Sequence, residues 1–572
     1  MLSVLVFILS ITGAWCALNL LQDGDFEAGN LTRAWSCSSC DMTLTPDSHT
    51  GGQSVKVLNR KFKYSGPAQV VPVQPGHRYS FTAYIKLLNQ LPGHLYHGVN
   101  IMIDIVHTNG KHHYDNMGKS PHIQLGTGWH LIGGDYLIPN DTKTFKVYIE
   151  IDQPQVNYLL DSATFEEVLP LHNFRSAADD RIEKLRKANV TIKLAGAHID
   201  PTGLTVDLEQ TYSEFIIASA IDAKMIVDPS YKKYQDFFYQ NFEWGLPSNA
   251  LKWIGTEHVE GHPHYSVPFA AVDALLKHGK KVKGHNIFWD VKKFVPTWQY
   301  NKSATDLKSL MAKRIQEVVG GLKGKLQHWD VNNENLHGDF YEQKLKDPNI
   351  TMWMFRETHK ADPAAKLFLN DYNIVNSHYD TFAFLDQATT FKKSGVPVGG
   401  IGIQSHMTPP VDIAAVKFRL DQVAKAGLPI VITELDVDTA DEQEKARIYE
   451  DLYRLYYSHP AVEGVVQWHF WSGRTWKPEA VLAEGPNITA NAAGRIVRQL
   501  VWGDWRTNQT LPISHDRDLH VRAFKGEYKL RVKHHGKVIR EEDFTLGQAG
   551  VDLTVSLSGS GTSPQVSQVI IG

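Results

Sequence analysis

The sequence predicts an α/β protein: a closed (β/α)₈ TIM barrel preceded by an all-β sandwich and followed by a small β appendage. The length of 572 residues allows about three or four domains. Apolar and polar residues alternate before residue 170 and again after residue 505, which is typical of β-sandwiches. Between these regions, apolar runs of strand length alternate with helical stretches, which is typical of a parallel sheet.

The first 16 residues have the features of a secretory signal peptide. Residues 2–11 are apolar apart from two serines, and Ala14 and Cys16 occupy the −3 and −1 positions of a cut before Ala17. The apolar stretch is too short to span a bilayer comfortably, and a short anchor helix is the alternative. Seven Asn-x-Ser/Thr sequons fit the same route, so we expect a secreted, extracellular glycoprotein. The sequons begin at Asn30, Asn140, Asn189, Asn301, Asn349, Asn487 and Asn508.

Residues 17–170 form the first predicted domain, the β-sandwich. Alternating runs at 79–85, 99–106 and 145–151 are separated by turns containing Pro, Gly and Asn. Cys37 and Cys40 remain as a pair once the leader is removed. In a secreted chain this close pair indicates a local disulfide, because a metal site would need two further soft ligands.

Residues 171–505 form the predicted barrel domain. A charged helical segment at 179–188 opens it, and eight apolar runs then alternate with helical stretches. Eight strands match a closed barrel of ordinary size. The predicted strands are residues 217–221, 251–253, 282–289, 327–333, 366–371, 400–406, 429–436 and 464–470.

Residues 506–572 form the last predicted region, the small β appendage. Alternation returns at 520–524, 528–532 and 551–557, and a Gly/Ser-rich tail follows at 556–563.

Composition excludes several classes of partner. Asp and Glu total 62 against 59 Lys and Arg, and no block of like charges suggests an arm for nucleic acid. The only long apolar run is at the N-terminus, so we expect no membrane partner beyond that segment. The 14 Trp residues suit stacking on planar or sugar-like ligands, although about half of them would serve the core.

Acidic residues follow two of the predicted strands, where the catalytic groups of such barrels lie. One strand runs into Trp329-Asp-Val-Asn-Asn-Glu334, and another into Ile432-Thr-Glu434-Leu-Asp436. A carboxylate directly after a buried strand is costly unless it meets water, a partner or a substrate. Two Glu facing each other about 5 to 5.5 Å apart suit a retaining glycosidase. The alternative for either motif alone is a Glu that caps a helix or pairs with Arg.

These two motifs resemble the signatures of glycoside hydrolase family 10, the xylanase family. Segments at 251–253, 284–289, 370–373 and 400–406 resemble the family on the matching strands. The resemblance covers residues 178–505. It implies an endo-acting hydrolase of β-1,4-linked xylan that retains anomeric configuration and requires no metal or other cofactor.

The resemblance assigns roles residue by residue. Glu334 matches the general acid/base and Glu434 the nucleophile. Asn333 matches the residue that binds the sugar 2-hydroxyl. His406 matches the histidine that hydrogen-bonds the nucleophile, and Asp436 would orient His406.

Further family positions imply contacts with the substrate. Gln404 and Tyr372 fall in segments that line the site, although for Gln404 and His406 a satisfied polar network is the alternative. The residues whose equivalents hold sugars are Asn249, Lys252, His285, Trp289, Trp468 and Trp476. For Trp471 we expect a core role.

The chain departs from the family on the glycone side. Ser248 stands where the family usually has Glu, and Asp290 and Lys292 stand where it has His and Gln. His469 replaces the usual Gly on the last predicted barrel strand. These departures affect substrate choice, because the Gln position is where the hydroxymethyl group of a hexose would be accommodated or refused.

The first domain resembles the jelly-roll carbohydrate-binding modules that often accompany such xylanases. The segments at 23–27 and 158–167 look like its opening and closing strands. Aromatic residues that could line a sugar groove, or belong to the core, are Trp35, Tyr64 and Tyr96. Carboxylates that could hold a structural calcium are Asp25, Glu27 and Asp161.

Three other functions compete with a secreted xylanase. The altered glycone side favours a β-1,4-glucanase or an enzyme with both activities. A non-catalytic glycan-binding protein is disfavoured, because a decayed site has no reason to keep both Glu with Asn333 and His406. A transglycosylase would use the same covalent intermediate. The expected partner is therefore xylan or β-1,4-glucan, and nothing in the sequence indicates an oligomeric state.

Overall fold

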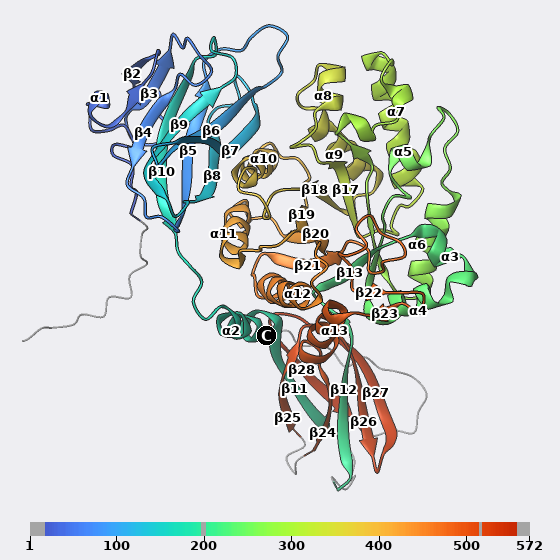
Figure 1. The fold of residues 1–572 in the computed structure, drawn as a ribbon. Helices are drawn as coiled ribbons and strands as arrows, with labels where there is room; N and C mark the ends of the chain where they lie inside the picture. The colour runs from blue at the N-terminus through green and yellow to red at the C-terminus, as the bar shows by residue number, and fades with distance from the viewer. Residues whose placement is uncertain (1–17, 196–201, 514–517, 558–572) are drawn as a thin grey trace, which may run out of the picture. The chain divides into compact units, whose positions relative to one another are not determined.

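The computed structural model describes residues 18–195, 202–513 and 518–557, and the chain forms two compact units (Figure 1). The first unit comprises Met1–Leu169 with His378–Ala383, and the second Pro170–Ser377 with Phe384–Gly572. The predicted leader and most of the predicted Gly/Ser-rich tail lie outside the described residues. Within the described part, no helix is long and apolar enough to cross a membrane.

The first unit is a β-sandwich of two five-stranded antiparallel sheets, as predicted. One sheet has the order β1(Ser36–Cys37), β4(Pro67–Val71), β9(Thr142–Ile151), β6(His97–His107), β7(His112–Ile123). The other has the order β2(Asp41–Thr45), β3(Ser54–Leu58), β10(Tyr158–Val168), β5(Arg78–Leu87), β8(His130–Leu137), and a short helix α1(Leu31–Ala34) precedes β1. Alternate residues of each strand are buried between the sheets, as Val99, Ile101 and Ile103 of β6 illustrate.

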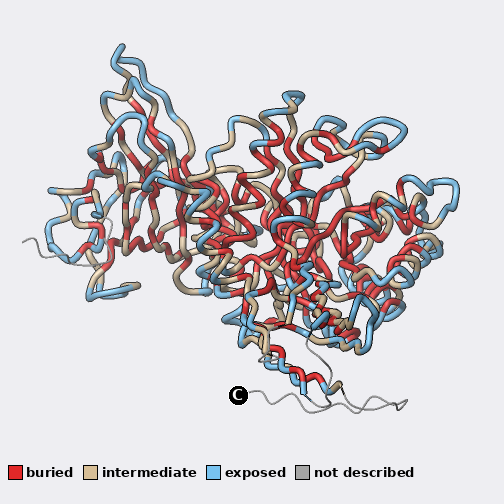
Figure 2. The backbone as a smooth tube through the Cα atoms, turned by 90° about the horizontal axis from the view of Figure 1, so that it is seen from below, coloured by how far each residue is buried: buried red, intermediate tan, exposed pale blue. Residues whose placement is uncertain are grey.

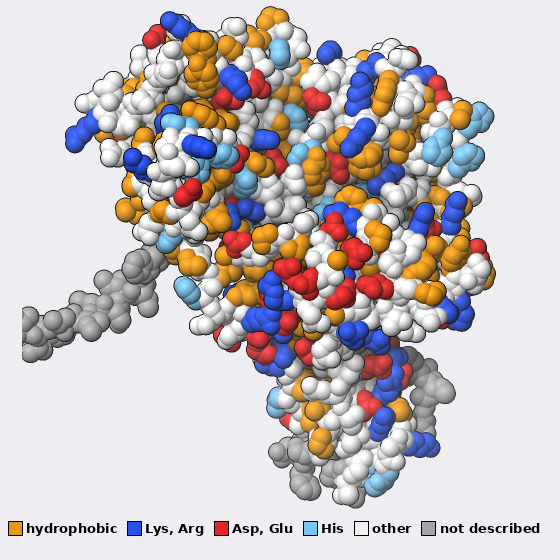
Figure 3. Space-filling view, viewed as in Figure 1, with side chains coloured by type: hydrophobic (Ala, Val, Ile, Leu, Met, Phe, Trp, Pro, Cys, Tyr) orange, Lys and Arg blue, Asp and Glu red, His pale blue; other side chains and the backbone are white. Residues whose placement is uncertain are grey.

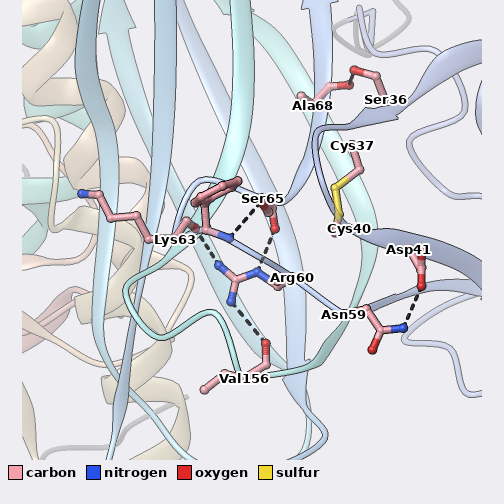
Figure 4. Close-up of a disulfide and its surroundings, with 11 residues drawn as sticks. Ser36, Cys37, Cys40, Asp41, Asn59, Arg60, Lys63, Ser65, Ala68 and Val156 are labelled. Atoms are coloured by element: carbon pink, nitrogen blue, oxygen red, sulfur yellow. Dashed lines mark hydrogen bonds between the residues drawn. A yellow bond between two sulfur atoms is a disulfide. The ribbon is translucent and has the colours of Figure 1, made fainter.

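A disulfide joins Cys37 and Cys40, with their Cα atoms 5.7 Å apart (Figure 4). Nearby, the buried guanidinium of Arg60 donates to the carbonyl groups of Ser65, Lys63 and Val156, which fastens the loop before β4.

The candidate groove aromatics differ in exposure. Trp35 is 3% exposed and its indole donates to the Asp23 carbonyl, so it belongs to the core. Tyr64 is exposed and stacks on exposed Phe62, with ring centroids 5.2 Å apart. Tyr96 is half-buried against His122.

Two of the predicted calcium ligands hold a loop. Glu27 Oε1 accepts from the backbone N–H groups of Gly52 and Gln53 at 2.7 and 2.9 Å. Asp161 Oδ2 accepts from those of His49 and Thr50 at 2.6 and 3.1 Å. Within the described ranges, no three His, Cys, Asp or Glu side chains converge as metal ligands would.

The second unit contains the predicted barrel of parallel strands. Its strands are β13(Ile216–Ile221), β14(Trp244–Pro247), β15(Lys281–Gly284) continued by β16(Phe288–Trp289), β17(His328–Asn333), β18(Lys366–Asp371), β19(Gly400–Met407), β20(Ile430–Val437) and β21(Val462–Gln467). The barrel closes because β13 pairs with β21 and β15 pairs with β17. Figure 2 shows buried backbone concentrated through this region, with exposed loops around it.

One predicted strand was wrong. Residues 251–253 form a turn and the start of α5(Trp253–Thr256), and the second strand is β14. Gly245 and Pro247 within β14 obscured its strand character, whereas Leu251 and Trp253 are apolar because they are buried beside the barrel.

Helices surround the barrel strands (Figure 1). They are α2(Phe174–Arg186), α3(Ala223–Val227), α4(Lys232–Asn241), α6(Ser266–Lys277), α7(Ala304–Ile315), α8(Phe340–Leu345), α9(Ile350–Ala361), α10(Thr381–Lys393), α11(Ile413–Ala424), α12(Glu442–Tyr457) and α13(Ala492–Arg498). A short hairpin, β22(Ala483–Glu484) and β23(Thr489–Ala490), precedes α13. The side chains of Asp412 and Asp441 cap α11 and α12 by accepting from N–H groups of the first turn.

The C-terminal β region includes two strands from before the barrel. β11(Lys187–Ala195) lies between β25(Asp518–Phe524) and β28(Val551–Ser556), and β12(Leu204–Ser213) lies between β24(Asn508–Pro512) and β26(Gly526–His534), which pairs with β27(Lys537–Leu546). The predicted boundaries of the barrel domain, 171–505, include residues 187–213. Pairing between segments about 300 residues apart leaves no signal in local periodicity, so the sequence could not reveal it.

Candidate active site

Glu334 directly follows β17 and is held in place by three neighbours. Its backbone N–H donates to the Asn370 carbonyl at 2.8 Å. Its Oε1 accepts from Gln404 Nε2 at 3.0 Å, and its Oε2 from the Trp289 indole at 2.8 Å. The backbone at Glu334 has φ 58°, a conformation that non-glycine residues adopt rarely and often at functional sites.

The surroundings of Glu334 favour its protonated form. Burial is the main cause, since the residue is only 8% exposed, and the charge of Asp371 adds to it. The hydrogen bonds from Gln404 and Trp289 oppose this effect, and the pKa of Glu334 rises to about 7.

Glu434 lies in β20, where two groups hydrogen-bond it and a second histidine lies nearby. His406 Nε2 is 3.2 Å from its Oε2, and Asn370 Nδ2 is 3.3 Å from its Oε1. His285 Nε2 is 3.9 Å from the same Oε1. Burial alone would raise the pKa of Glu434, but the His406 hydrogen bond and the charges of His285 and Lys252 outweigh burial and lower it. Glu434 is therefore ionised near neutral pH.

His406 links Glu434 to Asp436, as the resemblance implied. Its Nδ1 lies 2.9 Å from Asp436 Oδ2, which also accepts from the Trp476 indole at 3.0 Å. Burial opposes the imidazolium, but Asp436 and Glu434 raise the pKa of His406 to about 9. The ring thus carries a positive charge between two carboxylates.

A second buried network of polar residues reaches Glu434 through His285. Asp330 accepts from His285 Nδ1 at 2.9 Å and from Lys283 Nζ at 2.5 Å. Because Nδ1 is engaged with Asp330, Nε2 is the atom of His285 that faces Glu434. His285 was predicted from the sequence, whereas Lys283 on β15 and Asp330 on β17 were not.

Asn370 contacts the backbone of Glu334 and the carboxylate of Glu434, and it was not predicted from the sequence. Its Nδ2 donates to both Asn333 Oδ1, at 2.8 Å, and Glu434 Oε1, and its carbonyl accepts from the Glu334 N–H. Asn333 and Asn370 are register partners at the ends of β17 and β18. A polar residue at the end of a buried strand was the available signal, but the prediction in that segment went to Tyr372.

Aromatic rings gather around Lys252 beside the carboxylates. Lys252 Nζ lies 4.2 Å from the centroid of Trp289 and 5.7 Å from that of Trp468. Burial lowers the pKa of Lys252, while Glu434 and Glu334 oppose this shift. Trp289 also stacks on Phe294, with ring centroids 3.7 Å apart.

Other predicted contact residues lie further out. Asn249 is exposed in the turn after β14. Tyr372 stacks on His337 with ring centroids 3.8 Å apart. Trp476 is 59% exposed, although its indole reaches Asp436. Trp471, for which a core role was expected, is half-buried and donates to the Gly485 carbonyl.

Residues 207–493 match the sequence profile of glycosyl hydrolase family 10. The chain belongs to this family. Residues 18–155 match a carbohydrate-binding domain profile.

Curated relatives of the chain include plant and bacterial proteins. Endo-1,4-beta-xylanase 3 of Arabidopsis thaliana is 29% identical over 504 residues, covering 86% of this chain and 65% of that protein. Exoglucanase XynX of Acetivibrio thermocellus is 25% identical over 512 residues, covering 83% of this chain and 44% of that protein. The chain thus spans between about half and two thirds of the length of the curated relatives it matches first.

Solved structures match as well. Xylanase 10B from Thermotoga petrophila RKU-1 in complex with xylobiose is 23% identical with a TM-score of 0.47, covering 51% of this chain and 95% of that one. The CBM22-1–GH10 modules of Clostridium thermocellum xylanase 10B, complexed with xylohexaose, are 15% identical with a TM-score of 0.45, covering 82% and 94%.

The departures from the family 10 pattern have distinct surroundings. Ser248 is buried and donates to the Ile221 carbonyl at 3.3 Å. Lys292 is exposed, with Nζ 5.2 Å from the ring centroid of Tyr300. His469 occupies a left-handed backbone position, φ 61°, which explains why glycine suits this place, and burial lowers its pKa to about 4.

Proposed function

We propose that this family 10 protein is a secreted endo-1,4-β-xylanase that hydrolyses xylan by double displacement with retention. One observation carries the proposal: Glu334 and Glu434 both contact Asn370, and their pKa values are shifted in opposite directions. Two carboxyl groups whose surroundings separate their pKa values can divide the acid and nucleophile roles.

In the first step, Glu434 attacks the anomeric carbon while Glu334 gives its proton to the leaving glycosidic oxygen. The bond from the anomeric carbon to that oxygen breaks, and a glycosyl ester of Glu434 forms. The charged ring of His406 keeps Glu434 ionised and oriented before attack. The side-chain oxygen of Asn333 accepts a hydrogen bond from Asn370. The side-chain nitrogen of Asn333 is therefore the group that would donate to a sugar 2-hydroxyl.

In the second step, Glu334 takes a proton from water as the water oxygen attacks the anomeric carbon, and Glu434 leaves as a carboxylate. The charge of Glu434 contributes to the raised pKa of Glu334. Ester formation removes that charge, so the pKa of Glu334 falls when it must act as a base.

Activity on β-1,4-glucan is a second candidate function. Lys292 extends over Tyr300 into solvent, and Ser248 is short and bonded to a backbone carbonyl. These two replacements leave room on the glycone side for the hydroxymethyl group of glucose. A pocket discriminates one small group by only about 1 to 3 kcal/mol, so these positions can shift preference tens of fold. The relative named exoglucanase XynX is consistent with this activity.

Product analysis on xylan, carboxymethylcellulose and mixed-linkage glucan, side by side, tests both functions. We expect xylo-oligosaccharides first released in the β configuration, with measurable cleavage of soluble glucan. The double variant Lys292→Gln/Ser248→Glu should move the activity ratio towards xylan, and Lys293→Gln, an exposed neighbour, is the matched control. A wild type inactive on every soluble glucan, with unchanged xylan kinetics in the double variant, would show that these departures are neutral. Products longer than the substrate would indicate transfer to sugar.

We also propose that the first unit binds the same polysaccharide. The carbohydrate-binding domain match and the exposed stack of Phe62 and Tyr64 support this role, because flat aromatic faces suit pyranose rings. The full chain should co-sediment with insoluble xylan, and Phe62→Ala/Tyr64→Ala should weaken binding without changing turnover of short substrates. Unchanged binding would move the sugar site elsewhere on the unit.

Extracellular residence remains a proposal, supported by the Cys37–Cys40 disulfide and by the exposure of every sequon asparagine. Protein isolated from its source should lose mass on treatment with an N-glycosidase, and an unchanged mass would contradict the proposal.

A further inference from the structure

Two carboxyl groups are buried together behind the loop that carries Glu334. Asp290 is 0% exposed and Glu342 is 2% exposed, and each carboxyl group affects the pKa of the other. Asp290 directly follows Trp289, the residue whose indole donates to Glu334. Neither carboxyl group takes part in the mechanism described above.

Asp290 contacts the chain on both sides of Glu334. Its Oδ2 accepts from Asn332 Nδ2 at 2.9 Å, and its N–H donates to the Asn333 carbonyl at 3.0 Å. On the far side, its Oδ1 accepts from the Tyr341 N–H at 3.0 Å, and its carbonyl accepts from the Phe340 N–H at 3.2 Å. These four contacts fasten residue 290 to both ends of the loop 334–339, which joins β17 to α8 and is called the Glu334 loop below.

The loop also packs tightly on the backbone of Asp290. A Cβ atom at Gly338 would lie 2.4 Å from the Asp290 carbonyl carbon, so only glycine fits there. A displacement of residue 290 would therefore move both the loop and the adjoining Trp289 indole.

We propose that Asp290 is a positioning residue for the acid/base step: it holds the Glu334 loop and the Trp289 indole so that Glu334 reaches the leaving oxygen. The inference rests on the proposed function, because it assigns Asp290 to the step that Glu334 performs.

The hydrogen-bond pattern assigns the proton to Glu342. Both Asp290 oxygens accept from N–H groups, whereas Glu342 Oε1 accepts from the Thr351 hydroxyl at 2.6 Å and Glu342 Oε2 receives no hydrogen bond from the described residues. Burial, and then the charge of Asp290, raise the pKa of Glu342 well above its usual range. A protonated Glu342 can donate to an ionised Asp290, and the amide of a glutamine also combines a donor group with an acceptor oxygen.

The variants Asp290→Asn and Glu342→Gln form a matched pair. Asp290→Asn places an amide N–H against an N–H donor, so we expect kcat/KM on xylan to fall roughly 10- to 100-fold, part of the 10²–10⁴-fold that a general acid contributes. With an aryl xylobioside bearing a good leaving group, which needs little protonation, the same variant should lose less than about threefold. Glu342→Gln should stay within about twofold of wild type on both substrates.

Active-site titration gives the concentration of active enzyme, so that inactive protein does not distort kcat/KM. A merely structural defect should then lower kcat/KM equally on both substrates. An equal loss on both substrates for Asp290→Asn, or a Glu342→Gln variant as impaired as Asp290→Asn, would overturn the proposal. If Asp290→Asn does not fold, Asn332→Ala removes one donor to Asp290 and must show the same leaving-group dependence, or the proposal fails. Wild-type turnover of the aryl substrate is the control: its absence would contradict the proposed function rather than the role of Asp290.

Discussion

Glu334 and Glu434 occupy similar places but have opposite surroundings. Each lies at the carboxyl end of a barrel strand and is almost fully buried, and burial raises the pKa of both. Around Glu334 the added charges are negative, and its donors are the neutral groups of Gln404 and Trp289. Around Glu434 the neighbours are cationic. Charged neighbours, rather than burial, therefore decide which carboxyl group keeps its proton.

Figure 3 shows that acidic and basic side chains are interspersed over the visible face of the molecule. The difference between the charged neighbours of Glu334 and those of Glu434 is a local feature. Single ion pairs and hydrogen bonds therefore affect the pKa values of these residues more than the net charge of −3 does.

The largest expected effect is the loss of the nucleophile. Glu434→Gln keeps the shape of the side chain but cannot form the glycosyl ester, so turnover should fall more than about a thousandfold. The measurement is kcat on xylan, with circular dichroism to establish folding. A folded variant that keeps more than about a thousandth of wild-type turnover would contradict the nucleophile assignment.

The effect of removing the general acid on the rate should depend on the substrate. Glu334→Ala should slow hydrolysis of xylan by about 10²–10⁴-fold, because the leaving oxygen is no longer protonated. An aryl glycoside with a good leaving group should keep a fast first step, seen as a burst of phenol, with deglycosylation slowed. Equal losses on both substrates would argue against an acid/base role.

Removing the positive charge of His406 should raise the pKa of Glu434 towards that of Glu334. His406→Asn removes a charge-assisted hydrogen bond of about 1.5–3 kcal/mol, a loss of roughly 10- to 100-fold in kcat/KM. Because His406 helps to lower the pKa of Glu434, its loss should also move the acidic limb of the pH profile to higher pH. Asp436→Asn keeps the ring but lowers its pKa, so it should shift the limb in the same direction by less. An unmoved acidic limb in both variants would refute this role of His406.

The smallest expected effect concerns the alkaline limb. Glu334 must be protonated, so activity should fall as the pH rises through about 7. Asp371→Asn removes a charge that raises the pKa of Glu334 and should move this limb to lower pH. Trp289→Phe removes a donor that lowers this pKa and should move the limb to higher pH. Shifts of the same sign in the two variants would show that Glu334 does not control the limb.

Much of this site could be predicted from strand ends. The motifs around Glu334, Glu434 and Asp436 were readable because acidic residues directly after buried strands are unusual, and the structure places His406 beside Glu434 and Gln404 beside Glu334. Asn370 and Asp330 were missed because their importance comes from neighbours on adjacent strands. Local sequence contains no record of which side chain lies across a barrel.

The sequence by itself determined the barrel and its order with the two β regions, and it led to the prediction that Glu334 and Glu434 are the catalytic pair, because periodicity and strand-end motifs are local properties. Only the tertiary structure decided that β11 and β12 join the C-terminal sheets, that Asn370 contacts the Glu434 carboxylate and the Glu334 backbone, and that Asp290 supports the Glu334 loop. Their contacts and the resulting pKa shifts arise from distances between residues remote in sequence, and folding sets those distances.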